Sequence, residues 1–410
     1  MRRFVLPFVS LILVSAITGQ GGDIRRGRIE KLDLDKLSIT LKVADKDIDF
    51  RLIEETQVLG ATGKSLKERM KDFKVGSEIF FRAGKKDGIE LLTHVKLAEP
   101  GAKQPKKAPP KTDVSKLIPL PDLGEKEYQG HPGGFYPEGK NARPAEHEAA
   151  GLRLARDVQP RDAAGKPSAK GKIVLLSVGM SNTSQASSGF QRALAGFAQK
   201  NPAVVFVNGA QGGMTAARIQ NLDTMDGVKY WGEIDQRLES AGVTRAQVQA
   251  IWIKQADAGP TQGFPKYAKT LESELARIVQ LFPSRFPNAK LVYLSSRTYG
   301  GFETSGLNPE PYAYESGFSV KWLIERQIRG DKELNFDPKK GDVKAPWLSW
   351  GPYLWGNGSF QRDNGLINWA QADFTANDGT HLTPSGQDKA GRALLQFFVK
   401  DATTRTWFKQ

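Results

Sequence analysis

Residues 173–181 read IVLLSVGMS, and this stretch decides the fold of the larger part of the chain. Apart from Ser177, the six residues before Gly179 are apolar, as expected of a strand that is buried on both faces of a sheet. Further apolar runs lie at 204–207, 248–253 and 291–294. Helical patterns lie between and after these runs, at 189–199, 228–240, 267–281 and 385–400. Strands that alternate with helices predict a parallel α/β sheet whose ligands bind beyond the carboxyl ends of the strands.

A serine stands in the turn that follows this first strand, within Gly179-Met180-Ser181-Asn182. At the mouth of the sheet and near a helix start, the N–H group of Ser181 can face a developing oxyanion, and its hydroxyl can act as a nucleophile. A serine in such a turn is also a common helix N-cap. Ser181 alone therefore does not decide between the two roles.

A serine nucleophile needs a base, and the chain has four histidines. His381 lies in Asp378-Gly379-Thr380-His381, just before the last expected helix. The three-residue spacing lets Asp378 accept a hydrogen bond from one ring nitrogen while the other ring nitrogen faces a serine. No second histidine or carboxylate pair stands at metal-ligand spacing, so we expect neither a metal nor a cofactor.

The two segments resemble conserved blocks of the SGNH (GDSL-like) hydrolase superfamily. Residues 179–182 are similar to its first block, nearest in form to the G-Q-S-N of sialate O-acetylesterase-like and related carbohydrate esterases, and residues 378–386 are similar to its last block. The resemblance covers about 172–399. It implies a flavodoxin-like three-layer α/β/α domain and a serine esterase whose catalytic residues are Ser181, Asp378 and His381.

The resemblance also implies an oxyanion hole. Its backbone donors would be the N–H groups of Ser181 and of Gly213, with Gly212 as the competing position. The third block departs from the family's G-x-N-D pattern, because Gln255 and Asp257 stand there. Gln255 has amide N–H groups to donate, whereas an ionised Asp257 can only accept. We therefore expect Ser181, Gly213 and Gln255 to be the oxyanion donors.

A long segment rich in aromatic residues precedes Asp378. Rings on loops near the carboxyl edge of a sheet suit stacking against sugars, and packing of a glycine-rich insertion explains them equally well. With the resemblance, this segment favours an ester substrate of the acetylated-carbohydrate class. The residues expected to contact it are Asn182, Asp257, Trp350 and Trp355.

A second interpretation follows from the departure in the third block. If that change has removed catalysis, the same fold would serve as a binding module for an anionic polysaccharide or a cell-wall polymer. Hydrolysis of a small acetyl ester separates the two interpretations.

Composition shifts along the chain divide it into four expected parts. Short alternating patterns with glycine turns predict a small β-barrel-like domain of OB or SH3-like size. Proline and lysine together predict an extended tether. The parts are a signal peptide at 1–22, the β domain at 23–98, the Pro/Lys-rich linker at 99–118 and the hydrolase-like domain at 119–410, with a lead-in at 119–171.

The first residues are typical of an export signal. Arg2 and Arg3 precede an apolar run at 4–17, and small residues follow it. A membrane anchor is the alternative, but the run is shorter than the ~20 residues that span a bilayer. We expect cleavage between Ala16 and Gly22, a secreted or periplasmic protein, and no transmembrane segment in the mature chain.

The overall charge is strongly basic. The chain of 410 residues has 59 Lys and Arg against 45 Asp and Glu, a net charge of +14. This excess of positive charge is compatible with anionic partners, and the β domain with its basic linker could bind nucleic acid. That domain lacks a clear set of stacking aromatics, so we interpret the charge as a basic surface with a lysine-rich linker and expect no nucleic-acid partner. The absence of cysteine excludes disulfides and thiolate chemistry.

Overall fold

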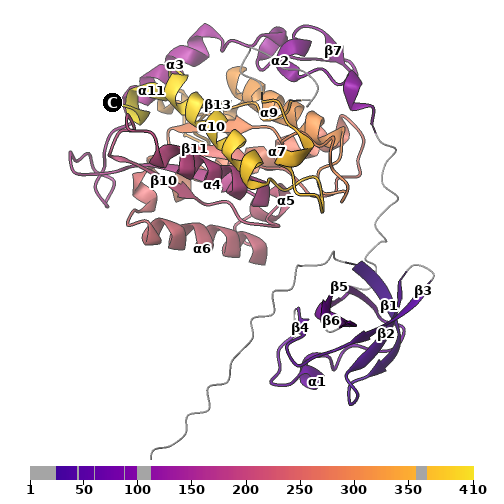
Figure 1. Ribbon diagram of the computed structural model, residues 1–410. Coiled ribbons are helices and arrows are strands. Elements are labelled where there is room, and N and C mark those ends of the chain that lie inside the picture. The colour runs from indigo at the N-terminus through magenta and orange to yellow at the C-terminus, as the bar shows by residue number, and fades with distance from the viewer. Residues whose placement is uncertain (1–24, 44–45, 60, 87, 99–111, 357–366) are drawn as a thin grey trace, which may run out of the picture. The chain divides into compact units, whose positions relative to one another are not determined.

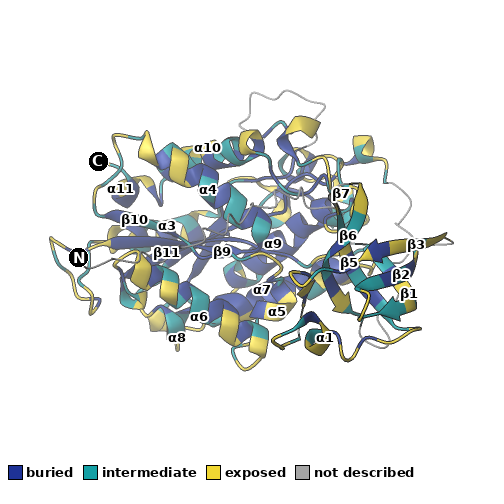
Figure 2. Ribbon diagram, turned by 60° about the horizontal axis from the view of Figure 1, so that its bottom comes forward, coloured by how far each residue is buried: buried dark blue, intermediate teal, exposed yellow. Residues whose placement is uncertain are grey.

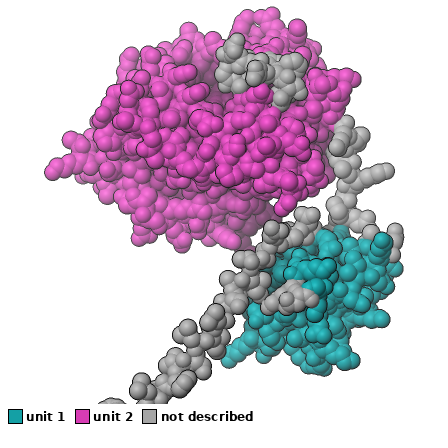
Figure 3. All heavy atoms as spheres, in the orientation of Figure 1, with its two compact units in different colours: residues 1–107 teal, residues 108–410 magenta. Residues whose placement is uncertain are grey.

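The computed structural model describes residues 25–43, 46–59, 61–86, 88–98, 112–356 and 367–410. The chain forms two compact units, residues 1–107 and residues 108–410, which are coloured separately in Figure 3. The expected signal peptide at 1–22 lies outside the described residues, and so does the expected linker from 99 to 111. Each unit has a hydrophobic core of its own.

The first unit is a small β-barrel with one short helix. Its strands pair in the order β3-β2-β1-β5-β6-β4, and a further pairing of β3 with β6 closes the barrel, as in the five-stranded OB fold. Buried residues alternate with half-buried or exposed ones along β2, so that Ile39 and Leu41 enter the core. The elements are β1 (Arg25–Asp33), β2 (Ser38–Val43), β3 (Lys46–Arg51), β4 (Gln57–Val58), α1 (Leu66–Arg69), β5 (Glu78–Lys86) and β6 (Ile89–Leu97).

The second unit is built on a parallel sheet, as the sequence predicts (Figure 1). Every residue of β9, β11 and β12 is buried, because helices cover both faces of the sheet. The strands are β9 (Ile173–Gly179), β10 (Val204–Asn208), β11 (Val248–Lys254), β12 (Leu291–Ser295) and β13 (Trp347–Trp350), and a separate two-stranded ribbon is formed by β7 (Glu127–Tyr128) and β8 (His131–Pro132).

Helices flank this sheet on two sides. Figure 2 shows α4 and α10 on one face and α6 and α7 on the other, with buried residues along the strands between them. Within the described residues, no helix has the length and apolar character that crossing a membrane requires. The helices of the unit are α2 (Leu120–Leu123), α3 (Ala145–Arg156), α4 (Ser181–Ala195), α5 (Ala216–Ile219), α6 (Met225–Ser240), α7 (Lys266–Gln280), α8 (Phe282–Arg285), α9 (Tyr312–Ile328), α10 (Pro384–Lys400) and α11 (Arg405–Phe408).

The order of the strands fixes where a ligand site is expected. In space they run β10-β9-β11-β12-β13, which is the order 2-1-3-4-5 of flavodoxin-like sheets. The chain leaves β9 toward β10 on one side and then crosses to β11 on the other side. Ligands of such sheets bind at this switch point, beyond the carboxyl ends of the strands. Ser181 begins α4 two residues after β9 ends, at that position.

The helix that begins with Ser181 and the helix that follows His381 cross at glycines. A Cβ atom at Gly189 of α4 would lie 1.8 Å from the carbonyl oxygen of Gln387 in α10. A Cβ atom at Gly391 of α10 would lie 2.1 Å from the carbonyl carbon of Gly189. Both distances are far below van der Waals contact, so neither position admits a side chain unless the helices separate.

We predict that Gly189→Ala lowers the free energy of unfolding by about 1–3 kcal/mol, because the added methyl group overpacks a backbone contact. Gly232→Ala is the matched control, since Gly232 lies in α6 and an added Cβ meets nothing within 4 Å. That control should gain roughly 0.5–1 kcal/mol from its helix position. Denaturant unfolding followed by circular dichroism measures both, and equal effects in the two variants would contradict a close helix crossing.

Candidate active site

Ser181 occupies the first turn of α4, directly beyond the carboxyl end of β9. The N-cap residue, Met180, contributes no side-chain hydrogen bond to the helix start. The first N–H groups of a helix have no partner inside the helix, and they carry the positive end of its dipole. If the Ser181 hydroxyl attacks a carbonyl carbon, the negative charge that develops on the carbonyl oxygen would therefore form beside this helix end.

The side chains of Ser181, His381 and Asp378 form one hydrogen-bonded chain. Oγ of Ser181 and Nε2 of His381 lie 2.8 Å apart, and Nδ1 of His381 hydrogen-bonds to Oδ2 of Asp378. The donor and acceptor roles follow if Nδ1 carries the ring proton, since the carboxylate can only accept. Nε2 is then free to accept the serine proton, which is what nucleophilic catalysis by a hydroxyl requires.

The loop that carries His381 is fixed by Asp378 itself. Oδ1 of Asp378 accepts hydrogen bonds from the N–H groups of Thr380 and His381 at 2.8 and 2.9 Å, and from the Thr375 hydroxyl at 2.7 Å. Partial burial alone would raise the pKa of this carboxyl, but the His381 ring and these three donors outweigh burial and lower the pKa to about 2. Asp378 therefore stays ionised and orients the imidazole.

The loop after β10 lies beside the serine. A Cβ atom at Gly212 would stand 3.8 Å from Cβ of Ser181, and the N–H group of Gln211 bonds to the carbonyl oxygen of Gly179 at 3.0 Å. Gly213 has a φ of +74°, a conformation that side chains disfavour. Within the described part of the chain, the N–H groups of Gly212 and Gly213 have no recorded acceptor. Both are thus available as oxyanion donors, and the geometry leaves the choice between them open.

The third expected oxyanion donor is buried beneath this loop. Gln255 is 3% exposed, its Nε2 donates to the carbonyl oxygen of Met214 at 2.8 Å, and its Oε1 accepts from the N–H group of Ala256. An amide nitrogen carries two hydrogens, so one N–H group remains for a further acceptor. Gln255 also ties the glycine loop to the end of β11.

Asp257 has internal partners. Its Oδ1 accepts from the N–H group of Ala217 in α5 at 3.1 Å, and its own N–H group donates to the Tyr267 hydroxyl at 3.0 Å. Burial, together with the charge of Asp257, raises the pKa of the neighbouring Glu274 to about 8. The Asp257 carboxylate thus holds α5 and faces a second carboxyl group, which the sequence did not indicate.

The structure gives no support to the expectation that Asn182 contacts substrate. Its side chain is 6% exposed and all of its polar atoms have partners inside the protein. Nδ2 donates to the carbonyl oxygen of Thr380 at 2.7 Å, while Oδ1 accepts from the Lys254 amine at 2.6 Å and from the Thr298 hydroxyl at 2.9 Å. The residue after Ser181 turns inward because α4 packs against the sheet and against the loop before α10.

The expectation that Trp350 and Trp355 contact substrate also has no support from the structure. Trp350 is 3% exposed and donates to the carbonyl oxygen of Phe135, and Trp355 is fully buried and donates to Oε1 of Glu310. Trp350 belongs to β13, a strand of the sheet, and Trp355 packs edge-on against Tyr299 and Tyr314. Packing of the insertion, the alternative explanation, accounts for both rings.

Sequence reasoning missed Lys254 and Thr298, which meet at Oδ1 of Asn182. Lys254 is the last residue of β11 and only 4% exposed. A charged residue that ends a buried apolar run is the signal that could have found it. Thr298 follows β12 without any comparable signal.

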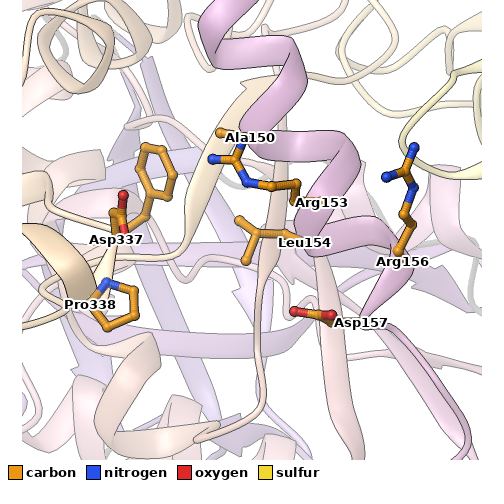
Figure 4. A pocket seen from close by; sticks show the side chains of 8 residues that line it. Ala150, Arg153, Leu154, Arg156, Asp157, Asp337 and Pro338 are labelled. Carbon is orange, nitrogen blue, oxygen red and sulfur yellow. The ribbon is translucent and has the colours of Figure 1, made fainter.

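A hollow of about 390 Å³ lies elsewhere on this unit (Figure 4). Asp157, in its lining, pairs with Lys290, the residue directly before β12. The hollow is therefore at the amino ends of the strands, opposite to Ser181. Its lining residues are Ala150, Arg153, Leu154, Arg156, Asp157, Phe336, Asp337 and Pro338. In the described segments, no group of three or more His, Asp or Glu residues could hold a metal ion.

No family model and no curated protein matches this sequence. Among solved structures, the chain is similar to a candidate SGNH hydrolase from Slackia heliotrinireducens, at 13% identity and a TM-score of 0.28 over 55% of this chain and 99% of that one. It is similar to a candidate GDSL-like lipase from Parabacteroides merdae at 12% identity and a TM-score of 0.29, over 60% and 98% of the chains. The chain is also similar to apo-CusF from Escherichia coli, at 15% identity and a TM-score of 0.16, over 22% of this chain and 100% of that one. At these identities and TM-scores, what the chain does has to follow from the geometry of its site.

We predict that Asp378→Asn destabilises the protein in a pH-dependent way. A carboxyl whose pKa falls from 3.8 to about 2 on folding stabilises the folded state above pH 3.8, and loses that contribution as the pH falls through about 2. The difference in unfolding free energy between wild type and variant should therefore be largest near neutral pH and shrink between about pH 4 and 2.

Urea unfolding at a series of pH values measures this difference. Asp388→Asn is the control, because Asp388 forms an exposed ion pair with Arg192, and such pairs contribute little to stability. A gap between wild type and Asp378→Asn that stays constant over this pH range would mean that the Asp378 hydrogen bonds do not depend on its charge.

Proposed function

We propose that the protein is a serine esterase of the SGNH (GDSL-like) type, which hydrolyses an O-acyl ester through an acyl-enzyme on Ser181. The observation that carries the proposal is the hydrogen-bonded chain from Ser181 through His381 to Asp378, at the switch point of a parallel sheet. Sequence positions 200 residues apart meet there at 2.8 Å. Support also comes from the order of the two sequence blocks, which is the order used by that superfamily.

The first step is attack on the ester carbonyl carbon. Nε2 of His381 takes the proton from Oγ of Ser181 as the C–O bond forms, and Asp378 stabilises the imidazolium. The imidazolium then gives this proton to the leaving alcohol oxygen as the ester C–O bond breaks. The acyl group is left on Ser181.

The oxyanion of the tetrahedral intermediate needs donors that are already in place. The N–H groups of Ser181 and of the glycine loop are the backbone candidates, and we keep Gly213 as the proposed donor. The remaining amide hydrogen of Gln255 would be the third. Because all three donors are held by the sheet edge, little reorganisation is needed when the charge develops.

The second half of the reaction returns the enzyme to its resting state. Water attacks the acyl-enzyme carbonyl carbon while His381 accepts a water proton, and the proton then passes to Oγ of Ser181 as the acyl bond to serine breaks. A carboxylic acid is released. Both halves use the same oxyanion donors and the same base.

The substrate class that we propose is an O-acetyl ester of a carbohydrate, cleaved outside the cytoplasm. The support is the likeness of Gly179-Met180-Ser181-Asn182 to the first block of carbohydrate esterases and the export pattern in residues 1–22. The buried rings of Trp350 and Trp355 give this substrate no support. No metal or cofactor takes part in the proposed reaction.

We predict that Ser181→Ala lowers kcat for an acetyl ester by on the order of 10³-fold or more, since a triad cannot work without its nucleophile. The melting temperature should stay close to that of the wild type. Acetate release from p-nitrophenyl acetate and from an acetylated oligosaccharide measures the loss on both substrates. Ser188→Ala, in the same helix and bonded only to the carbonyl oxygen of Ser184, is the control and should remain active.

Two outcomes would contradict the proposal. If Ser181→Ala retains near wild-type activity, another residue is the nucleophile. If the wild type hydrolyses neither ester yet binds an anionic polysaccharide, the binding-module interpretation holds instead. Activity on the nitrophenyl ester alone would keep the esterase and remove the carbohydrate substrate.

A further prediction concerns the third donor. Gln255→Ala should lower kcat by about 10²–10³-fold with little change in KM, because an oxyanion donor acts on the transition state. Asp257→Asn should stay near wild type, since its amide oxygen can still accept from the N–H group of Ala217. Steady-state kinetics on one acetyl ester compares them. The reverse ranking of the two variants would mean that Asp257 acts as a base or as an orienting residue, and that the oxyanion hole has backbone donors only.

A further inference from the structure

A lysine is buried at the centre of the candidate site. Lys254 ends β11, next to the carboxyl end of β9, and its side chain is 4% exposed. Among the residues that the structure describes, no carboxylate forms an ion pair with its amine. Burial, followed by the charge of Arg297, lowers the pKa of Lys254 well below its ordinary value. A buried, unpaired amine is costly, and groups of this kind gather at functional sites.

The amine has one protein partner that leads directly to the site. Lys254 Nζ donates to Oδ1 of Asn182 at 2.6 Å, and the Thr298 hydroxyl donates to the same oxygen at 2.9 Å. On its other side, Nδ2 of Asn182 donates to the carbonyl oxygen of Thr380 at 2.7 Å. The carbonyl oxygen of Thr380 can only accept, so the amide nitrogen must face it and the amide oxygen must face Lys254. The orientation of Asn182 is therefore decided by chemistry.

This set of contacts joins the two halves of the hydrogen-bonded chain. Asn182 directly follows Ser181, and Thr380 directly precedes His381. The backbone carbonyl of Lys254 also accepts a hydrogen bond from the Thr183 hydroxyl, so the lysine holds two successive residues of the α4 start. We propose that Lys254 is a positioning residue, which acts through Asn182 to hold Ser181 and His381 in register for proton transfer.

The inference rests on the proposed function, because register matters only if a proton moves between the two residues. Without the amine, Oδ1 of Asn182 loses one of its two donors and keeps the Thr298 hydroxyl. The Asn182 side chain is then held less firmly, and so is the loop before α10, which hydrogen-bonds to it through Thr380. A shift of about 1 Å between reacting groups can cost on the order of 10²-fold in rate.

Lys254→Met tests this role, since methionine is similar in length and is tolerated in an apolar interior. We expect kcat for p-nitrophenyl acetate to fall about 10- to 100-fold with KM nearly unchanged, and the melting temperature to stay level or rise. A residue that only supports the fold would lower the melting temperature without such a selective loss of kcat. Wild-type kcat in a folded Lys254→Met would overturn the proposal.

Lys321→Met is the matched control. Lys321 is 1% exposed in α9, donates to the carbonyl oxygens of Pro132 and Gly133 and pairs with Glu325. It is a buried lysine outside the Ser181 site. Its removal should lower the melting temperature and leave kcat unchanged. A kcat loss equal to that of Lys254→Met would mean that any buried lysine has the same effect, which would overturn the proposal.

Asn182→Asp keeps the acceptor for Lys254 but replaces the donor to Thr380 with an oxygen. It should lose kcat as strongly as Lys254→Met, and the double variant should lose little more than either alone, because all three break one contact chain. If Lys254→Met does not fold, Asn182→Asp decides, and wild-type kcat in that variant overturns the proposal.

Ser181→Ala, assayed in parallel, separates the two levels of inference. Its full activity would remove the proposed function itself. Its inactivity together with a fully active Lys254→Met would remove only the positioning role of Lys254.

Discussion

The close crossing of α4 and α10 at Gly189 and Gly391 is the constraint on which the site depends. Ser181 is the first residue of α4, and His381 stands three residues before α10 begins. Because the two backbones touch at the glycines, the helix starts cannot move apart independently, and the hydroxyl and the imidazole meet at 2.8 Å. Nucleophilic catalysis tolerates a misplacement of about 1 Å only poorly. The two glycines in the middle of the helices thus set the distance between Ser181 and His381 at the helix starts.

Much of this arrangement can be predicted from the sequence, because its signals are local. A strand that is buried on both faces, such as 173–178, has to be almost wholly apolar, and the structure places a strand at Ile173–Gly179. A carboxylate three residues before an imidazole can reach it within one loop, as Asp378 and His381 do. The start of α4 is harder to predict from the sequence. The sequence predicts a helix at 189–199, whereas α4 runs from Ser181 to Ala195. The first turns of α4 are polar although Asn182 and Thr183 pack inward, so they lack the apolar pattern of a buried helix face.

What the sequence could not reveal is decided by contacts between distant segments. The helix α9 escaped notice because it is buried nearly all round, which removes the one-sided apolar pattern of a surface helix. The strand β13 is short and its sequence is typical of an aromatic loop, so the sequence predicts a substrate contact for Trp350 instead of a position in the sheet. The sequence also predicts a substrate contact for Asn182, because its neighbour is Ser181. Its direction is set instead by Lys254 and Thr380, whose proximity no local pattern encodes.

The charge buried at this edge of the sheet favours catalysis over binding. Arg297 is 7% exposed, so it cannot contact an anionic polymer in solvent. Arg297 keeps its charge in any protein environment, and its Nη1 bonds to the carbonyl oxygen of Asp257, beside the expected third block. Fixed charge of this kind acts through a low dielectric on a negative charge that develops nearby, without having to rearrange. A binding surface gains nothing from a cation that its ligand cannot reach, whereas a transient oxyanion beside Ser181 would gain from it.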